Sequence, residues 1–168
     1  MGMLKIVLVA FLYLLLSDFI STFFYHVPEH IFGKFHALIH HSKNRSFIRY
    51  AISSSQPLAL VTGFLSAFPY ILFIPILGWI SPTGMIIGLS LALAHVEWRH
   101  LPENRWQTPI LIQNLCQFFY ITTPERHEQH HRNSKAAYGD IFTFFDRPAQ
   151  AWFKLLVQLR KKVRNQYS

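Results

Sequence analysis

The strongest constraint on the fold of this chain is a run of 47 residues, Tyr50 to Val96, that contains no Asp, Glu, Lys or Arg. As a helix, such a run would extend about 70 Å at roughly 1.5 Å per residue. That length is enough for two crossings of a hydrocarbon core roughly 30 Å thick, with a turn between them. We therefore expect two membrane-spanning helices here, at about residues 57–77 and 80–98.

Three prolines, Pro69, Pro75 and Pro82, each allow the turn between these two spans. The stretch GWISPTG is favoured, because Ser-Pro and Thr-Gly are common turn dipeptides. A turn there leaves the third span short at its far end unless the helix continues through His95.

An earlier apolar stretch, residues 4–25, is also about as long as one span and is interrupted only by Lys5 and Asp18. A cleaved signal peptide is the alternative, because a lysine followed by an apolar run is typical of one. No A-x-A-like cleavage site follows, and cleavage there would leave the first histidines at the new terminus. We therefore expect an uncleaved membrane anchor.

These stretches predict an all-α fold, namely an integral membrane protein with about three transmembrane helices, or four, and a histidine-rich cytoplasmic cap. Residues 1–168 would form a single domain. Charged residues make up 14% of the chain, against about 25% in soluble domains. Residues 106–121 mix polar and apolar side chains and fit a helix in the membrane interface. The basic tail, residues 154–168, would lie against lipid headgroups or form a solvated end.

Three spans place the segment after the first span and the segment after the third on the same side of the membrane. Of the 16 Lys and Arg residues, only Lys5 lies outside those two segments. The positive-inside rule then makes that side cytoplasmic and puts the N-terminus outside. The membrane would be the plasma or thylakoid membrane in a prokaryote, or the endoplasmic reticulum in a eukaryote. The net charge is +8, and we expect the basic side chains to contact anionic lipid and not nucleic acid.

All ten histidines fall in four clusters, and all four lie on this one predicted side. The clusters are HVPEH (His26, His30), HALIHH (His36, His40, His41), HVEWRH (His95, His100) and HEQHH (His127, His130, His131). Histidines three or four residues apart share a face of an α-helix. By that rule, His41 lies about 140° from His36. His95 and His100 are equally far apart, so these two would reach different metal ions unless the helix unwinds between them.

This constellation indicates a metal site. Imidazole suits Zn, Cu, Fe and Ni, and eight to ten imidazoles exceed the needs of one ion and match two. The motif HVEWRH lacks the H-E-x-x-H spacing of zinc proteases, so we expect Glu97 to orient a ligand. Asp18, Asp140 and Asp146 are expected to accept hydrogen bonds from ligand imidazoles, although helix capping is an equal alternative for the last two. The single cysteine, Cys116, excludes an intrachain disulfide and any CxxC site.

From about Asp18 to Pro148 the sequence resembles the fatty acid hydroxylase/sterol desaturase superfamily of membrane di-iron enzymes. The resemblance rests on the two-three-two-three pattern of histidines, on FHALIHHSKN and on RHEQHHRNSKAAYGDIFTFFDRP. In that family a closing HxxHH is followed by a Tyr-Gly pair and an aromatic-Asp pair, and Tyr138-Gly139 and Phe145-Asp146 match these. The short chain is similar in layout to the carotenoid ring hydroxylases.

The resemblance implies an oxidoreductase whose two iron ions use O₂ to hydroxylate or desaturate a lipid dissolved in the membrane, such as a fatty acyl, sterol-like or carotenoid substrate. All ten histidines would be metal ligands, and zinc would also fit them. The chain has no flavin, haem or nucleotide motif. Electrons would therefore come from a separate ferredoxin- or cytochrome b5-type donor with its reductase, docking on the basic face.

The sequence departs from the family pattern in two clusters. The second cluster reads HxxxHH where HxxHH is usual, which leaves open whether both His36 and His41 are ligands. Pro28 bars a regular helix through HVPEH unless the helix bends there. The alternatives are a metal transporter or sensor that is not an enzyme, and a non-catalytic family member that acts as an assembly partner.

Overall fold

The computed structural model describes residues 2–41, 46–101, 105–134 and 136–166. Within these ranges the protein is largely helical and has no strands, as expected; an isolated bridge joins Ile121 and Phe142. Three basic residues assigned to the cytoplasmic side, Lys43, Arg45 and Lys135, and the last two residues of the expected tail lie outside the described residues.

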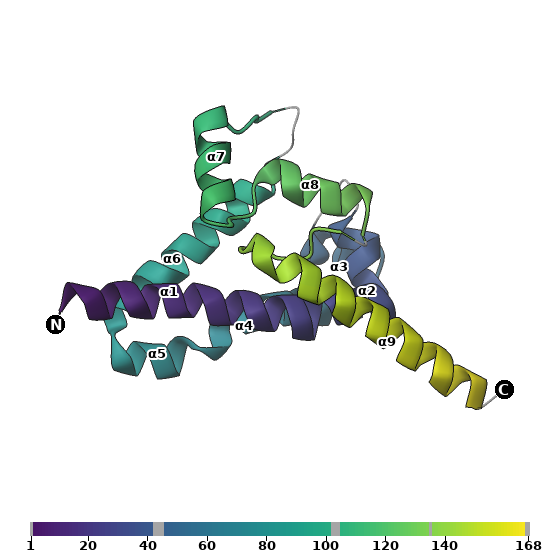
Figure 1. The fold of residues 1–168 in the computed structure, drawn as a ribbon. Helices are drawn as coiled ribbons and strands as arrows, with labels where there is room; N and C mark the ends of the chain where they lie inside the picture. Colours follow the sequence, from purple (N-terminus) through teal and green to yellow (C-terminus); the bar gives the residue numbers. More distant parts are fainter. Residues whose placement is uncertain (1, 42–45, 102–104, 135, 167–168) are drawn as a thin grey trace.

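The first expected span is the start of a longer helix that runs from Met3 to Phe32 without interruption (Figure 1). It consists of α1 (Met3–Ile20), a π-helical segment η1 (Ser21–His26) and α2 (Val27–Phe32). Pro28 has no N–H, and its ring would collide with the carbonyl of residue 24 in a regular α-helix. The π-helical turn lies directly before it and changes the hydrogen-bond register, so that the helix continues through HVPEH.

The uncharged run forms three helices after α3 (Phe47–Ser53), namely α4 (Leu58–Leu72), α5 (Ile74–Ile80) and α6 (Pro82–Arg99). The chain turns at Ser81, within GWISPTG, where the Ser81 hydroxyl caps α6 by accepting from the Gly84 N–H. A break at Phe73 ends α4 earlier than the expected residue 77, because Pro75 fits only the first turn of a helix.

Two helical stretches in the described residues are long and apolar enough to cross a membrane, Met3–Phe32 and Leu58–Ile80. The helix α6 covers the third expected span, but its last turn is polar, with His95, Glu97 and Arg99.

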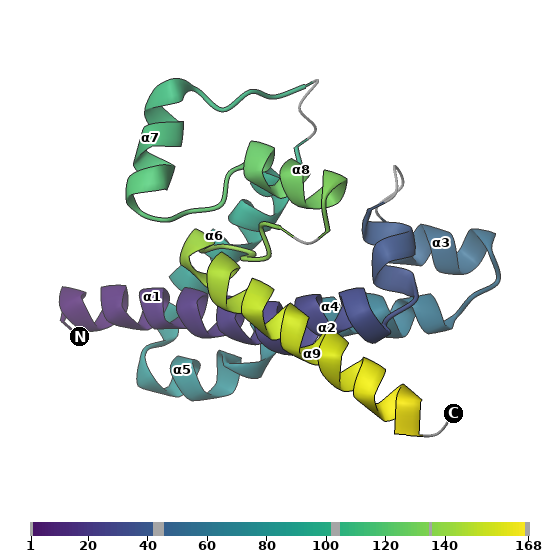
Figure 2. The same ribbon diagram turned by 45° about the vertical axis from the view of Figure 1, so that its right-hand side comes forward.

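The helices α1 and α6 pack closely side by side and run in the same direction (Figures 1 and 2). Gly84 lies against Ile6 and Val9, and one turn later Gly88 lies against Ala10 and Tyr13. Small residues let two helix backbones approach where no hydrophobic force drives them together, as in a membrane. Because the two helices are parallel, the end of α1 and the end of α6 lie at the same end of the molecule.

The C-terminal part folds over that end. It comprises α7 (Ile110–Phe118), α8 (Pro124–Arg132), the short η3 (Thr143–Phe145) and α9 (Asp146–Gln166). Only α7 is helical in the region expected to be an interfacial helix, and its Ile110, Leu111 and Phe118 are exposed. The base of α9 packs on α2 and on η1, where the Trp152 indole donates to the Phe23 carbonyl, and the expected basic tail is the far end of α9 (Figure 2).

We predict that Gly84→Ala destabilises the protein by about 1–3 kcal/mol. A methyl group at this position would lie 2.7 Å from the Ile6 carbonyl oxygen and 2.9 Å from the Val9 Cβ, so the two helices would have to separate. The thermal midpoint in detergent measures the effect. Gly78→Ala is the matched control, because its new methyl group would meet only the Met85 Cε at 3.6 Å. Equal midpoints for the two variants would contradict the close packing of α1 on α6.

Candidate metal centre

Eight of the ten histidines form two groups of four, and within each group one ring nitrogen from every member lies within 4.8 Å of the others. The first group is His26, His30, His36 and His130, and the second is His40, His100, His127 and His131. The first group joins residues 26–36 to His130, and the second joins His40 to His100 and to residues 127–131, so each group combines segments that are far apart in the sequence. The fold therefore brings the four histidine clusters together at the end of the molecule where α1 and α6 both end.

The π-helix η2 (His36–His40) gives the unusual spacing of HALIHH its structural meaning. A π-helix closes its hydrogen bonds five residues apart, so positions four and five residues apart share one face. His36 and His40 stack at a centroid distance of 4.8 Å, and His41 lies 5.8 Å from His36. The expectation that His41 points about 140° away from His36 is therefore wrong, because it assumed an α-helix.

The helix α8 supplies histidines to both groups. His130 belongs to the first group, while His127 and His131, one α-helical turn apart, belong to the second. The segment η2 is divided in the same way between His36 and His40. Two short helical segments thus connect the two groups and fix their separation.

The hydrogen bonds of the rings direct the Nε2 atoms toward the centre of each group. The Nδ1 atoms of His130 and His100 lie 2.7 Å and 2.6 Å from the carbonyl oxygens of Ala136 and Val96, respectively. A carbonyl accepts only from a protonated nitrogen, so in both rings the lone pair is on Nε2. Metal-binding histidines are commonly held by an outer hydrogen bond of this type.

The spacing of the Nε2 atoms fits neighbouring ligands of one ion. His130 Nε2 lies 2.9 Å from the Nε2 atoms of both His26 and His30, and His127 Nε2 lies 3.0 Å from His131 Nε2. Two nitrogens that each lie about 2.0–2.1 Å from a metal and subtend a right angle are about 3 Å apart. Among the described residues the buried His36 Nε2 has no hydrogen-bond partner, which agrees with a nitrogen whose lone pair faces an ion. The residues therefore fit two metal ions.

Burial and mutual proximity keep the imidazoles neutral, as ligation requires. Burial, with the neighbouring His26, lowers the pKa of His36 and of His130 to about 2. Burial and adjacent histidines also hold the pKa of His40 well below its usual range, and burial and Arg99 do so for His127. Neutral rings offer their lone pairs without first releasing a proton.

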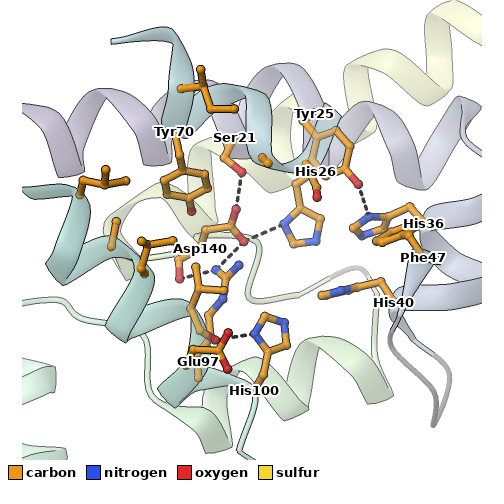
Figure 3. A pocket seen from close by; sticks show the side chains of 18 residues that line it. Ser21, Tyr25, His26, His36, His40, Phe47, Tyr70, Glu97, His100 and Asp140 are labelled. Carbon is orange, nitrogen blue, oxygen red and sulfur yellow. Dashed lines mark hydrogen bonds and ion pairs between the residues drawn. The ribbon is translucent and has the colours of Figure 1, made fainter. Parts of the chain in front are cut away.

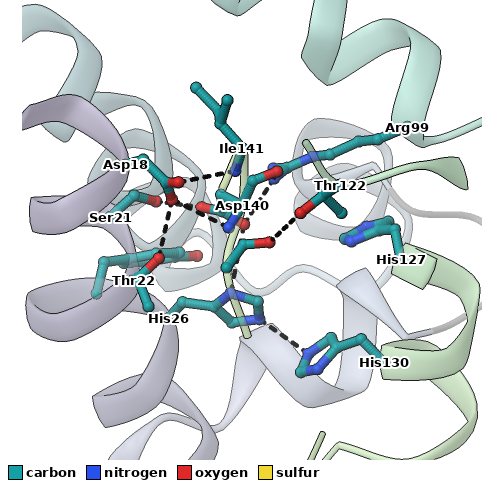
Figure 4. Close-up of polar contacts among 12 residues, drawn as sticks. Asp18, Ser21, Thr22, His26, Arg99, Thr122, His127, His130, Asp140 and Ile141 are labelled. Carbon is teal, nitrogen blue, oxygen red and sulfur yellow. Dashed lines mark hydrogen bonds and ion pairs between the residues drawn. The ribbon is translucent and has the colours of Figure 1, made fainter. Parts of the chain in front are cut away.

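A buried ion pair positions His26 (Figure 4). An Asp140 carboxylate oxygen lies 3.4 Å from His26 Nδ1 and 2.7 Å from the Arg99 guanidinium, and the Ser21 hydroxyl donates to the other oxygen. Burial alone would raise the pKa of Asp140, but Arg99 and His26 lower it well below its usual range. The expected role of Asp140 as a partner of a ligand imidazole agrees with this arrangement.

Asp18 and Asp146 make contacts other than the hydrogen bonds to ligand imidazoles expected of them, and Asp146 agrees with the alternative of a helix-end role, since it is the first residue of α9. The Asp18 carboxylate accepts from the backbone N–H groups of residues 140, 141 and 142, because it is buried in α1 beside that segment (Figure 4). Asp146 accepts from the Gly139 N–H and from Arg126, which ties the start of α9 to α8. Glu97 is exposed, and its role in orienting a ligand stays a prediction. The Val96 carbonyl accepts from His100 Nδ1, and an Asp140 carboxylate oxygen lies beside His26 Nδ1.

Two histidines lie outside both groups. His41 is adjacent to them, with centroid distances of 4.9 Å to His30 and 4.8 Å to His131. His95 is separated from them and directs its Nε2 to the Thr122 carbonyl oxygen at 2.8 Å. Because a carbonyl requires a donor, that nitrogen carries the proton and has no lone pair for a metal. The expectation that His95 and His100 serve two different ions is therefore not met, since only His100 reaches a group.

Sequence reasoning missed several residues that support the site. Arg99 was counted only as a positive charge, although its position beside His100 at the end of an apolar run was a signal. The Tyr25 hydroxyl lies 3.2 Å from His36 Nδ1, and no sequence pattern indicated that contact. The carbonyl oxygens of Val96 and Ala136 are backbone atoms, so no residue type could have revealed them.

A cavity of about 610 Å³ lies beside both groups (Figure 3). His26 and His36 of the first group and His40 and His100 of the second form part of its wall. The remaining wall is largely apolar and comes from α4 and α6, with side chains such as Ile71, Leu89 and Leu93. The arrangement can place an apolar molecule against both groups at once.

We predict that the protein binds two metal ions and that His127→Ala reduces the content to about one ion per chain. The substitution removes one of four ligands in the second group while the first group stays intact. Metal analysis of purified, reconstituted protein measures the content. His95→Ala is the matched control and should retain two ions, because its ring faces the Thr122 carbonyl. A loss of metal in His95→Ala equal to that in His127→Ala would contradict the assignment.

We predict that the metal-free protein loses stability as the pH falls below about 6.5. The folded state holds the pKa of His36 and His130 at about 2, whereas in the unfolded chain it is about 6.5. Between these values the unfolded chain binds more protons, so stability falls as the pH is lowered. The thermal midpoint at pH 8 should therefore exceed that at pH 5 by several degrees. A midpoint that is unchanged or higher at pH 5 would contradict the burial of neutral imidazoles.

Comparison with known proteins agrees with this geometry. The family model described as fatty acid hydroxylase matches residues 10–150, which include all ten histidines and the buried acids Asp18, Asp140 and Asp146. No curated protein and no solved structure gives a significant match. Since the match covers most of the chain, this protein belongs to the fatty acid hydroxylase family.

Proposed function

We propose that the protein is a membrane oxidoreductase that holds two iron ions and uses O₂ to hydroxylate or desaturate a lipid. The observation that carries the proposal is the cavity whose wall combines histidines of both groups with apolar side chains of α4 and α6. A metal store or transporter needs ligands but no apolar chamber beside them. Family membership supports the same class of reaction.

Iron held by such ligands supplies the activation of dioxygen that oxidation of an unactivated C–H bond requires. The side chains of the protein bind and orient the substrate, and they exclude water from the site. Asp140 holds His26 Nδ1, and Ala136 holds His130 Nδ1, so that both rings keep their Nε2 atoms turned inward. Ile71, Leu89 and Leu93 provide an apolar wall against which a lipid chain can lie.

The substrate would enter from the bilayer. Leu93 on α6 and Ile71 on α4 line the cavity and are also exposed, at 56% and 48% of their surface, on helices that we propose to be surrounded by lipid. We further propose that the histidine groups lie on the cytoplasmic side, with the N-terminus outside. The run of basic residues in α9 would then face that compartment.

Electrons would come from a separate acidic carrier protein. A groove between α2 and α9 is lined by Arg160, Lys161 and Arg164, and His30 of the first group also forms part of it. A positive groove that reaches a ligand of the metal centre is a suitable place for an acidic donor to dock. We propose this groove as the site of electron transfer.

The proposal is tested by assaying the purified protein in lipid nanodiscs with ferrous iron, O₂, and a ferredoxin or cytochrome b5 and its reductase. We expect two iron ions per chain and O₂-dependent conversion of a membrane lipid, seen by mass spectrometry as a gain of oxygen or a loss of two hydrogens. His130→Ala should abolish the conversion, because it removes a buried ligand of the first group.

Two results would contradict the proposal. Less than one iron per chain after careful reconstitution, with no oxidised lipid, would exclude the function of an iron-dependent oxidoreductase. Two bound ions without any oxidation of lipids extracted from the source cells would instead favour a metal-handling protein or a non-catalytic family member. Full activity in His130→Ala would remove HEQHH from the active site.

A further inference from the structure

The cavity beside the metal centre has a polar part as well as an apolar wall. Arg99, Tyr70 and Ser21 all line it. Figure 3 shows Tyr70 and Ser21 near Asp140, and the Arg99 guanidinium lies 2.7 Å from the Asp140 carboxylate. Polar side chains in a mainly apolar pocket usually fix the orientation of a ligand, because each needs a hydrogen-bond partner. The hydrogen bonds that these groups already make therefore show which of them remain available.

Two of these groups have donors that no group in the described part of the chain satisfies. The Arg99 side chain is 93% buried, and its Nη1 donates to both the backbone and the carboxylate oxygens of Asp140, but its Nε is buried without a partner. The Tyr70 hydroxyl is also buried, and no described residue meets the geometry of a hydrogen bond with it, although the Ser21 hydroxyl, which donates to Asp140, lies close by. Leaving two donors unsatisfied in one pocket is costly unless a bound molecule accepts from them.

The local charges indicate what kind of acceptor fits. The positive charge of Arg99 is already balanced by Asp140 at 2.7 Å, and Glu97 adds a second carboxylate to the cavity wall. A ligand carboxylate at Arg99 would therefore bring a further negative charge close to Asp140, at an energetic cost in a site of low dielectric constant. A neutral oxygen, as in a hydroxyl, ester or amide, accepts from both donors without that repulsion.

We propose that Tyr70 and Arg99 bind a neutral oxygen atom of the substrate, so that the substrate is a lipid bearing a hydroxyl, ester or amide group and not a free fatty acid or a pure hydrocarbon. This inference rests on the proposed function, since it concerns the ligand of the same cavity. Tyr70 is then a specificity-determining residue. Its hydroxyl selects the ligand, while the apolar wall of α4 and α6 holds the hydrocarbon chain.

The test measures binding and needs no turnover, so it remains informative even if the protein does not oxidise lipids. Zinc-loaded protein in nanodiscs binds tritiated 1-hexadecanol, and unlabelled methyl palmitate, palmitate and hexadecane compete for the site. We expect methyl palmitate to compete at least about threefold more strongly than either palmitate or hexadecane. Tyr70→Phe should weaken the binding of hexadecanol roughly three- to tenfold, which corresponds to the loss of one hydrogen bond.

Tyr120→Phe is the matched control, because it removes the same hydroxyl from a side chain that is 57% exposed and does not line the cavity. It should leave all affinities unchanged. The competition by hexadecane should be the same in Tyr70→Phe and in the wild type, which also shows that the variant folds. Palmitate or hexadecane competing as strongly as methyl palmitate would overturn the proposal, as would an unchanged affinity of Tyr70→Phe for hexadecanol.

Discussion

The hydrogen bonds between the buried Asp18 carboxylate and the backbone of residues 140–142 are the interaction on which the rest of the site depends. The carboxylate lies in the middle of an apolar helix and accepts from the N–H groups of three consecutive residues, Asp140, Ile141 and Phe142, and from the Thr22 hydroxyl. A buried acid is tolerated only when its oxygens are satisfied in this way. The arrangement fixes the segment after α8 against α1, more than 100 residues away in the sequence.

That fixed segment positions the candidate metal centre. Asp140, the first of the three residues, directs its carboxylate to two groups. One is His26, on the long helix that also carries Asp18, and the other is Arg99 at the end of α6. One polar network therefore joins α1, α6 and the segment that follows α8. The parallel packing of α1 on α6 at Gly84 and Gly88 makes the network geometrically feasible, because it brings the ends of the two helices together.

Departures from regular helix geometry are concentrated at the histidines. The π-helical segments η1 and η2 contain or end at three of the eight grouped histidines, His26, His36 and His40. Such segments are rare and occur mostly at functional sites. Here η1 allows the helix to pass Pro28, and η2 brings His36 and His40 onto one face, so that one short segment serves both groups.

Much of the site could be predicted from the sequence. The uncharged run indicated paired apolar helices, the GWISPTG turn was favoured, and the spacing of the histidines indicated that they act together. The sequence alone determined the composition of the site, because ligand chemistry depends on residue type. Ten clustered imidazoles indicate metal binding more strongly than any other role. The sequence could not determine which histidines share an ion, since α-helical angles are wrong in a π-helix.

Only the tertiary structure decided the roles of the acids, of Arg99 and of His95. Asp18, Asp140 and Asp146 look alike in the sequence, yet one holds a backbone segment, one positions His26 and one ties α8 to α9. His95 seemed equivalent to His100 until its ring was found to face a carbonyl oxygen. A hydrogen bond depends on which atoms meet across the fold, and residue type specifies only what each atom can donate or accept.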